Sequence, residues 1–163
     1  MKKRSAGILM YKKSGSDIFL LLVHPGGPFW KKKDFGSWSI PKGEYEEGED
    51  PLTAAKREFE EELGKEPRGA FWELGECIQP SKKIITAWAL EGEFDVHELK
   101  SDVFEMEWPP KSNQRRAFPE VDRAEWFIPA DARKKILPGQ AGFIDRLLQR
   151  IGFEEPNQRS ITQ

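Results

Sequence analysis

Alternating apolar and polar positions run along much of this chain and predict a series of short strands. Residues 5–11 (SAGILMY) and 17–24 (DIFLLLVH) are rich in aliphatic side chains, and a Lys/Ser/Gly turn between them indicates a hairpin. Trp38-Ser39-Ile40 is a shorter extended piece that ends at Pro41. Further strands are expected at 71–78, at 83–90 with 92–95 as an extension, at 102–108 and at 123–128.

Helical periodicity replaces this alternation between Pro51 and Leu63. Asp50 is a good N-cap, Pro51 fits the first helical position, and Gly64 is the usual type of residue just past a helix end. At about 100° per residue, the apolar positions form one stripe along this helix, which should therefore face a core. The stripe consists of Leu52, Ala55, Phe59 and Leu63.

A second amphipathic helix is expected at 143–151, where Phe143, Leu147 and Ile151 are in register. Strands on both sides of a middle helix, followed by a closing helix, predict a mixed sheet that is covered on both faces. Periodicity by itself is compatible with an α/β or an α+β fold. The length is typical of one domain with its own core, spanning residues 1–163.

The first of these helices also carries a dense group of carboxylates. Glu58, Glu61 and Glu62 form an arc beside the apolar stripe, where they repel one another unless a cation lies between them. Mg²⁺ prefers such oxygen ligands and often binds together with substrate phosphates. Arg57 can clamp Glu61, four residues later, or Glu49 from the preceding loop. A solvated acidic face, or a protein-interaction surface without metal dependence, is the alternative interpretation.

The spacing of charged and glycine residues from 43 to 65 resembles the Nudix box. In that pattern a glycine is followed after five residues by Glu, after seven more by Arg-Glu, and then by Glu-Glu and a second glycine. The chain departs from the pattern at Lys65, where an apolar residue is usual, and Phe59 is bulkier than the usual aliphatic residue. Neither departure should abolish metal binding. The matching residues are Gly43, Glu49, Arg57, Glu58, Glu61, Glu62 and Gly64.

This resemblance implies a Nudix-type αβα sandwich with a mixed sheet, and hydrolysis of a pyrophosphate linkage. It also implies a divalent cation, Mg²⁺ with Mn²⁺ as an alternative. By the same carry-over, the metal ligands are Glu58, Glu61, Glu62 and the Gly43 carbonyl, and the catalytic set is Glu58, Glu61 and Arg57 with a general base.

The general base is not fixed by the resemblance, because family members take it from different places. One of the box glutamates is a candidate. Glu120 is the candidate from a later loop, since it follows a Pro/basic segment and precedes the predicted strand 123–128. The alternative is that Glu120 is an ordinary surface acid.

Basic and aromatic residues near the box and on predicted loops are candidates for substrate binding. Lys42, next to the box, and the pair Arg115-Arg116 are expected to contact phosphates. A Gly/Pro-rich loop carries Phe29 and Trp30, whose rings are expected to stack on a nucleobase. The alternative role of the basic residues is solubility.

The lead-in WSIPKG at 38–43 resembles that of diadenosine polyphosphate hydrolases and of the related diphosphoinositol polyphosphate hydrolases. The expected substrate is therefore a nucleoside diphosphate linked to another group, with a dinucleoside polyphosphate as first choice. Nucleoside triphosphates (oxidised or not), nucleotide sugars and ADP-ribose are the alternatives. A Nudix-fold domain that binds a nucleotide without cleaving it is an alternative of another class, although such domains usually lose box carboxylates that this chain keeps.

Composition narrows the choice of binding partner and of cellular compartment. The net charge of −2, from 26 basic and 28 acidic residues, is not that of a general nucleic-acid binder, so a small nucleotide is the expected partner. Cys77 is the only cysteine, which rules out an internal disulfide and fits a reducing cytoplasm. No apolar run is long enough to cross a membrane. His24 and His97 lack metal-ligand spacing and are interpreted as structural or surface residues, and the oligomeric state is left open.

Overall fold

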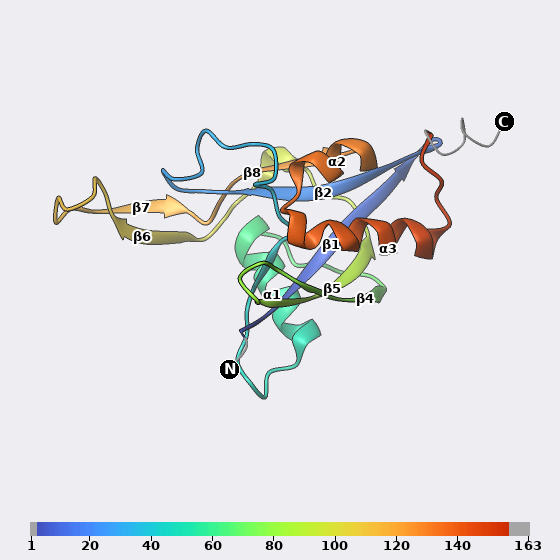
Figure 1. Ribbon diagram of the computed structural model, residues 1–163, viewed down its shortest axis with the longest axis horizontal. Helices are drawn as coiled ribbons and strands as arrows, with labels where there is room; N and C mark the ends of the chain where they lie inside the picture. The colour runs from blue at the N-terminus through green and yellow to red at the C-terminus, as the bar shows by residue number, and fades with distance from the viewer. Residues whose placement is uncertain (1–2, 157–163) are drawn as a thin grey trace.

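A six-stranded mixed sheet forms the centre of the protein in the computed structural model, which describes residues 3–156 (Figure 1). The strands lie in the order β4-β5-β1-β2-β8, and the short β3 pairs with β1. The pair β1–β5 is parallel, whereas the other pairs are antiparallel. The strands are β1 (Arg4–Ser14), β2 (Asp17–Pro25), β3 (Lys42–Glu44), β4 (Phe71–Ile78), β5 (Ile84–Glu91) and β8 (Val121–Phe127).

Helices cover both faces of this sheet, as Figure 1 shows, and successive residues of β1 point into two separate cores. Ile8 belongs to the core beneath α1 (Pro51–Leu63). Leu9 belongs to the core on the other face, beneath α2 (Pro129–Lys135) and α3 (Ala141–Ile151). This arrangement confirms the predicted αβα sandwich with a mixed sheet.

The helix α1 begins and ends where its capping residues predict. The Asp50 carboxylate accepts a hydrogen bond from the Thr53 N–H at 3.0 Å, and Pro51 takes the first helical position. At the other end Gly64 has a φ of 82°, a left-handed conformation that glycine adopts without strain. The predicted stripe is confirmed, because Ala55, Phe59 and Leu63 are buried and Leu52 is half-buried.

A two-stranded ribbon of β6 (Val103–Glu107) and β7 (Arg115–Pro119) lies outside the main sheet. Figure 1 shows it projecting from the body of the molecule. The expectation of a loop at Arg115 is therefore wrong, because this segment pairs along its length with β6. Phe118 lies opposite Phe104, with ring centroids 6.1 Å apart, and this cross-strand pair stabilises the ribbon.

Several short elements are not signalled by the hydrophobic pattern, among them β3, α2, η1 (Val96–Glu98) and η2 (Pro138–Gln140). The expected extension of β5 through 92–95 is wrong, because the Asp95 side chain caps η1 and turns the chain away from the sheet. No helix within residues 3–156 has the length and apolar character needed to cross a membrane.

Candidate active site

Gly43 and Glu58 are in direct contact at the edge of the main sheet. Gly43 belongs to β3 and pairs with Ala6 of β1, whereas Glu58 projects from α1. A Cβ atom on Gly43 would stand 2.0 Å from Glu58 Cδ, so only glycine leaves room for this carboxylate. The first residue of the box is thus a glycine because the helix presents an acid directly against the strand.

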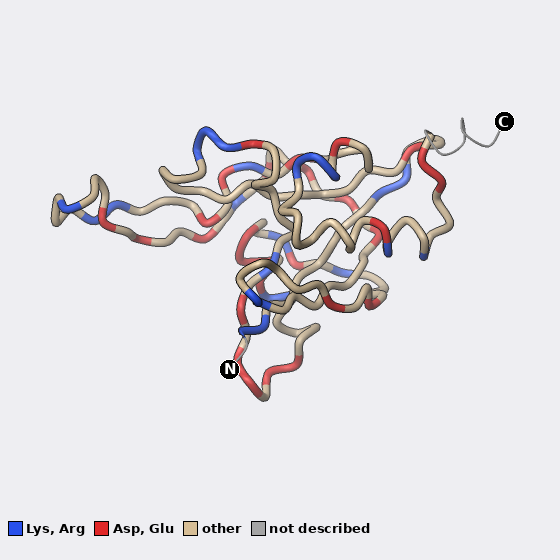
Figure 2. Tube along the Cα trace, viewed as in Figure 1, with Lys and Arg blue, Asp and Glu red and all other residues tan. Residues whose placement is uncertain are grey.

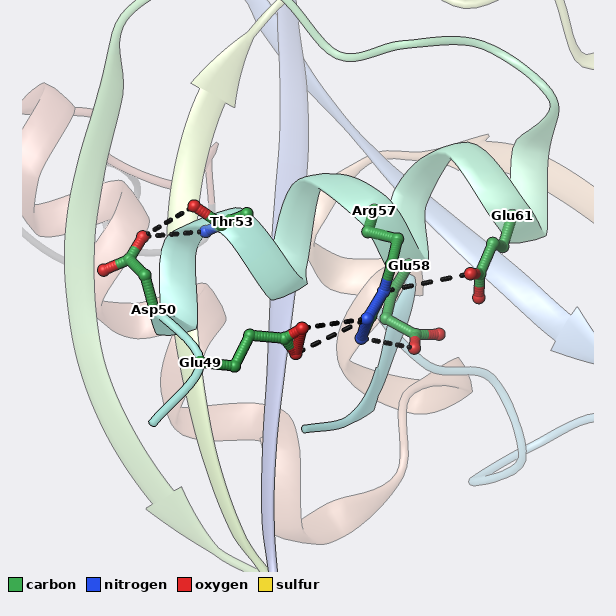
Figure 3. A network of polar contacts seen from close by, with 6 residues as sticks. All are labelled: Glu49, Asp50, Thr53, Arg57, Glu58 and Glu61. Atoms are coloured by element: carbon green, nitrogen blue, oxygen red, sulfur yellow. Dashed lines mark hydrogen bonds and ion pairs between the residues drawn. The ribbon is translucent and has the colours of Figure 1, made fainter. Parts of the chain in front are cut away.

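Arg57 contacts three carboxylates of the box, as Figure 3 shows. Its guanidinium nitrogens lie 3.0 Å from Glu49 Oε2, 3.3 Å from Glu58 Oε1 and 3.8 Å from Glu61 Oε1. The expected contacts with Glu49 and Glu61 are confirmed, and Glu58 is an additional partner. Because the guanidinium is planar and rigid, it orients all three acids at once.

Glu62 is the buried member of this acidic group, with 8% of its surface exposed. Its Oε1 accepts a hydrogen bond from the Lys42 N–H at 3.1 Å. Burial raises the pKa of Glu62 to about 8, although the charge and the N–H of Lys42 act in the opposite direction. Burial also raises the pKa of Glu58 to about 7, and the charge of Glu61 adds to that rise.

Glu120 lies in the turn between β7 and β8, and the fold brings it to the box. Its N–H donates to the Asp102 carbonyl at 2.8 Å, and the Asp102 N–H donates to the Glu61 carbonyl at 2.8 Å. Glu120 is an exposed residue, but its partial burial beside the box raises the pKa of its carboxyl, and the charges of Glu61 and Asp102 raise it further. Asp102 was missed by sequence analysis because its backbone makes these links, and backbone groups leave no signature in the sequence.

A pocket of about 210 Å³ opens beside these acids. Trp30, Lys42, Glu62 and Glu120 all line it, so four of the residues predicted from the sequence converge on one cavity. Burial lowers the pKa of the Lys42 ammonium, and the nearby Glu62 carboxylate opposes that effect. The pocket therefore combines an aromatic ring, an amine and two carboxyl groups.

Three other residues that the sequence predicts to bind substrate lie away from this pocket. Phe29 is 60% exposed and packs edge-on against Trp108, with ring centroids 5.5 Å apart. Arg115 is exposed on the ribbon, 3.7 Å from Glu105 Oε2. Arg116 precedes Glu120 by four residues, which is about 13 Å along an extended strand. The structure thus does not bring these three side chains to the pocket beside the box.

The box acids suit a hard divalent cation in their chemistry. Their ligand atoms are carboxylate oxygens, and the raised pKa values of Glu58 and Glu62 reflect burial and repulsion between neighbouring acids that a cation would relieve. Within residues 3–156, however, no three His, Cys, Asp or Glu side chains already converge as a ligand set. Glu58 and Glu61 contact Arg57 instead.

A mixed sheet between two helical layers, with an acidic helix on one face, defines the protein as a Nudix-type sandwich. The family model described as NUDIX domain matches residues 1–147, so the chain belongs to the NUDIX domain family. The protein is accordingly a pyrophosphohydrolase, and enzymes of this family generally use divalent metal ions. No curated protein sequence matches the chain.

Solved structures with the same fold include an Ap4A hydrolase binary complex from C. elegans, 21% identical, with a TM-score of 0.64 over 91% of this chain and 98% of that one. The NUDIX domain of Shewanella oneidensis NrtR, complexed with ADP ribose, is 13% identical, with a TM-score of 0.64 over 93% and 89%. A MutT structure from a study of Aliivibrio salmonicida and Vibrio cholerae is 14% identical, with a TM-score of 0.52 over 90% and 96%. At these identities the likeness concerns the fold.

Proposed function

We propose that this enzyme cleaves a nucleoside diphosphate linked to another group, with a dinucleoside polyphosphate as its first substrate. The single observation that carries this proposal is the pocket where Trp30 and Lys42 lie beside Glu62 and Glu120. An aromatic ring suits a nucleobase, and an amine suits a phosphate. The neighbouring acids suit the hydrolytic step.

Metal dependence is part of the proposal. Glu58, Glu61, Glu62 and the Gly43 carbonyl would hold Mg²⁺, or Mn²⁺ in its place. A bound cation of this kind neutralises phosphate charge and makes water more acidic. The Arg57 guanidinium contributes by keeping the carboxylates in position, with Glu49 as its outer anchor.

The side chains around the pocket take part in substrate binding and in proton transfer. Glu120 accepts the proton of the attacking water, a role that suits its raised pKa. Lys42 holds a phosphate oxygen that would otherwise repel the box acids. Trp30 stacks on the nucleobase and so orients the bond that breaks. Phe29, Arg115 and Arg116 remain candidates for the distal part of a long substrate.

The choice of a dinucleoside polyphosphate rests on the WSIPKG lead-in and on the shared fold of the C. elegans Ap4A hydrolase. ADP-ribose is the second candidate, because the Shewanella oneidensis domain of the same fold is complexed with ADP ribose. Nucleotide sugars and nucleoside triphosphates remain further alternatives. A non-catalytic nucleotide-binding domain is disfavoured, since the box carboxylates are all kept.

The deciding experiment is chromatographic measurement of the magnesium-dependent formation of the two phosphorylated products from each of a panel of these nucleotides. We expect the dinucleoside polyphosphate to give the highest kcat/KM, and Glu61→Gln with Glu62→Gln to lower kcat by about 10² or more. Glu60→Gln is the matched control, because Glu60 is an exposed acid of the same helix. Equal turnover by the double variant, or turnover without metal, would contradict the proposal.

The role of Glu120 has its own test. Glu120→Gln keeps the shape of the side chain and removes its basicity, so kcat should fall by about 10² with little change in KM. Glu125→Gln is the control, since Glu125 is an exposed acid on the following strand β8. A near-normal kcat in Glu120→Gln would transfer the role of base to a box glutamate.

We further propose that residues 1–163 form one domain and that the enzyme works in the cytoplasm. The family model covers most of this length, and the lone Cys77 thiol suits a reducing compartment. Limited proteolysis would test the first statement by releasing no second folded fragment, and localisation of a tagged protein would test the second.

A further inference from the structure

His24 is an ionisable side chain enclosed completely within the sandwich. It lies near the end of β2, and none of its surface is exposed. Its Nδ1 is 2.8 Å from Asp122 Oδ1, and its Nε2 is 2.7 Å from the Lys33 carbonyl oxygen. The sequence predicts only a structural or surface residue here, and gives no sign of these two partners.

The two partners hold the ring in one orientation. The Asp122 carboxylate lies at one ring nitrogen and the Lys33 carbonyl at the other, so rotation of the ring would lose both contacts. The Asp122 carboxylate also lies 3.6 Å from Arg123 Nε.

Through these bonds His24 joins the segment around Asp122 to the segment around Lys33, and both segments contribute residues to the pocket. Asp122 follows Glu120 by two residues at the start of β8, and Lys33 follows Trp30 by three residues in the loop after β2. Trp30 and Glu120 line the pocket itself. The ring of His24 is thus a cross-link between the segment that carries the aromatic wall and the segment that carries the acid.

Neighbouring contacts hold the cross-link in one geometry. The Trp38 ring lies edge-on to His24, with centroids 5.1 Å apart. Trp38 Nε1 in turn donates to Asp34 Oδ1 at 2.8 Å, and Lys135 pairs with the same carboxylate. The loop is therefore fastened just after Lys33, so a change at His24 is expected to move the part of the loop that precedes Lys33, where Trp30 lies.

We infer that His24 is a positioning residue that sets the spacing between Trp30 and Glu120 and thereby the fit of the nucleotide. It touches no substrate and acts through Asp122 and Lys33. The inference rests on the proposed function, since it concerns the same pocket. It predicts that nucleotide affinity depends on a side chain outside the pocket lining.

The first test needs no activity. The chain has two histidines, so ¹⁵N NMR of the imidazole rings is readily assigned with a His97→Gln control. Asp122→Asn weakens the contact at Nδ1, so we expect it to shift the His24 ring signals and the indole N–H signal of Trp30 and to leave the His97 signals in place. An unmoved Trp30 signal would overturn the inference.

The second test uses His24→Phe, which keeps an aromatic ring of similar size and removes both hydrogen bonds. We expect KM for the dinucleoside polyphosphate to rise by about tenfold or more, with a smaller change in kcat. The indole N–H signal of Trp30 should shift as well. His24→Gln, which can still donate to the Lys33 carbonyl, should recover part of the affinity.

The possible outcomes distinguish a failure of this inference from a failure of the proposed function. Should the wild type hydrolyse none of the nucleotides, the NMR signals of the His24 ring and of Trp30 still decide the role of His24. A folded His24→Phe with normal KM and an unmoved Trp30 signal would overturn the inference and leave the hydrolase proposal standing. If His24→Phe does not fold, His24→Gln should still raise KM above the wild-type value, because it lacks the contact of the ring with Asp122, and a normal KM together with an unmoved Trp30 signal in that variant would overturn the inference.

Discussion

Arg57 illustrates how one side chain organises several charges at the box. It approaches Glu49, Glu58 and Glu61, yet the Arg57 side chain is 40% exposed. Ion pairs exposed to this degree contribute little to the free energy of folding. Arg57 therefore orients the three acids rather than stabilising the fold. It holds them where a cation can replace the guanidinium contacts.

A substitution at Gly43 tests the proposed metal site at the scale of a single residue. Gly43→Ala would place a methyl group 2.0 Å from Glu58 Cδ and would force the carboxylate away from the strand. We expect kcat to fall by about 10² and the magnesium requirement to rise, because a displaced acid no longer completes the site. Steady-state kinetics over a magnesium titration would measure both effects.

Glu58→Ala supplies the control for that substitution. With the carboxylate already removed, adding the methyl group at Gly43 should cause no further loss of stability or activity, and a double-mutant cycle would report this coupling. Additive losses in the cycle would mean that the methyl group acts through a partner other than Glu58.

At the scale of elements, the box helix depends on its ends. The Asp50 carboxylate accepts from the Thr53 N–H and hydroxyl at the start of α1. At the other end, the Lys100 N–H donates to the Leu63 carbonyl and the Asp102 N–H to the Glu61 carbonyl. Carbonyls without partners inside the helix are thus bound by the segment that leads to the ribbon. The position of the helix and the position of Glu120 are therefore linked.

Replacement of the N-cap should have a measurable effect on stability. Asp50→Ala removes the acceptor for the Thr53 N–H, and we expect a loss in the free energy of unfolding. Urea denaturation would measure it. Asp50→Ser, which retains a capping oxygen, should lose only a fraction of this amount, and equal losses in both variants would show that capping is not the cause.

Element boundaries were predictable wherever local chemistry sets them. The bounds 51–63 and 71–78 match α1 and β4 because caps, a proline and glycines mark the first, and turn residues flank the second. β7 was not predicted, since Arg115 and Arg116 interrupt the apolar alternation and its pairing with β6 is a longer-range contact. α2 is short and ends without a glycine, so its sequence lacks the usual signals.

At the scale of the whole molecule, the site draws on segments that are distant in the chain. The loop after β2 contributes Trp30, β3 contributes Lys42, α1 contributes Glu62, and the turn before β8 contributes Glu120. Figure 2 shows acidic segments along the box helix and the loop before it, with basic segments nearby. The fold thus concentrates negative charge in one place although the net charge of the chain is only −2.

This concentration of charge predicts an unusual pH dependence. The pKa values of Glu58 and Glu62 are raised from the ordinary 4.5 to about 7 and about 8, so the folded, metal-free protein holds protons that the unfolded chain releases. Because the unfolded state binds fewer protons in this range, the free energy of unfolding should fall as the pH rises from about 4.5 to about 8. Urea denaturation in EDTA at several pH values would measure this.

Magnesium should reverse the trend, because a bound cation stabilises the ionised acids that otherwise repel one another. Stabilisation by Mg²⁺ should therefore be greatest at pH values above about 8. In a variant with Glu58→Gln and Glu62→Gln, the free energy of unfolding should neither decline as the pH rises nor increase when Mg²⁺ is added. A metal-free wild type that becomes more stable between pH 5 and 8 would contradict the raised pKa values.

The sequence by itself determined the chemistry of the box and the ends of its helix. These features follow from local rules, because caps, periodicity and charge spacing act over a few residues. The sandwich fold was implied by the resemblance to the Nudix box, since periodicity alone left an α/β and an α+β fold open. Only the tertiary structure decided that Trp30, Lys42 and Glu120 share one pocket, that Arg115 lies out on the ribbon, and that His24 joins two segments. Such placements depend on strand pairing and on contacts between distant parts of the chain, and local sequence patterns do not encode them.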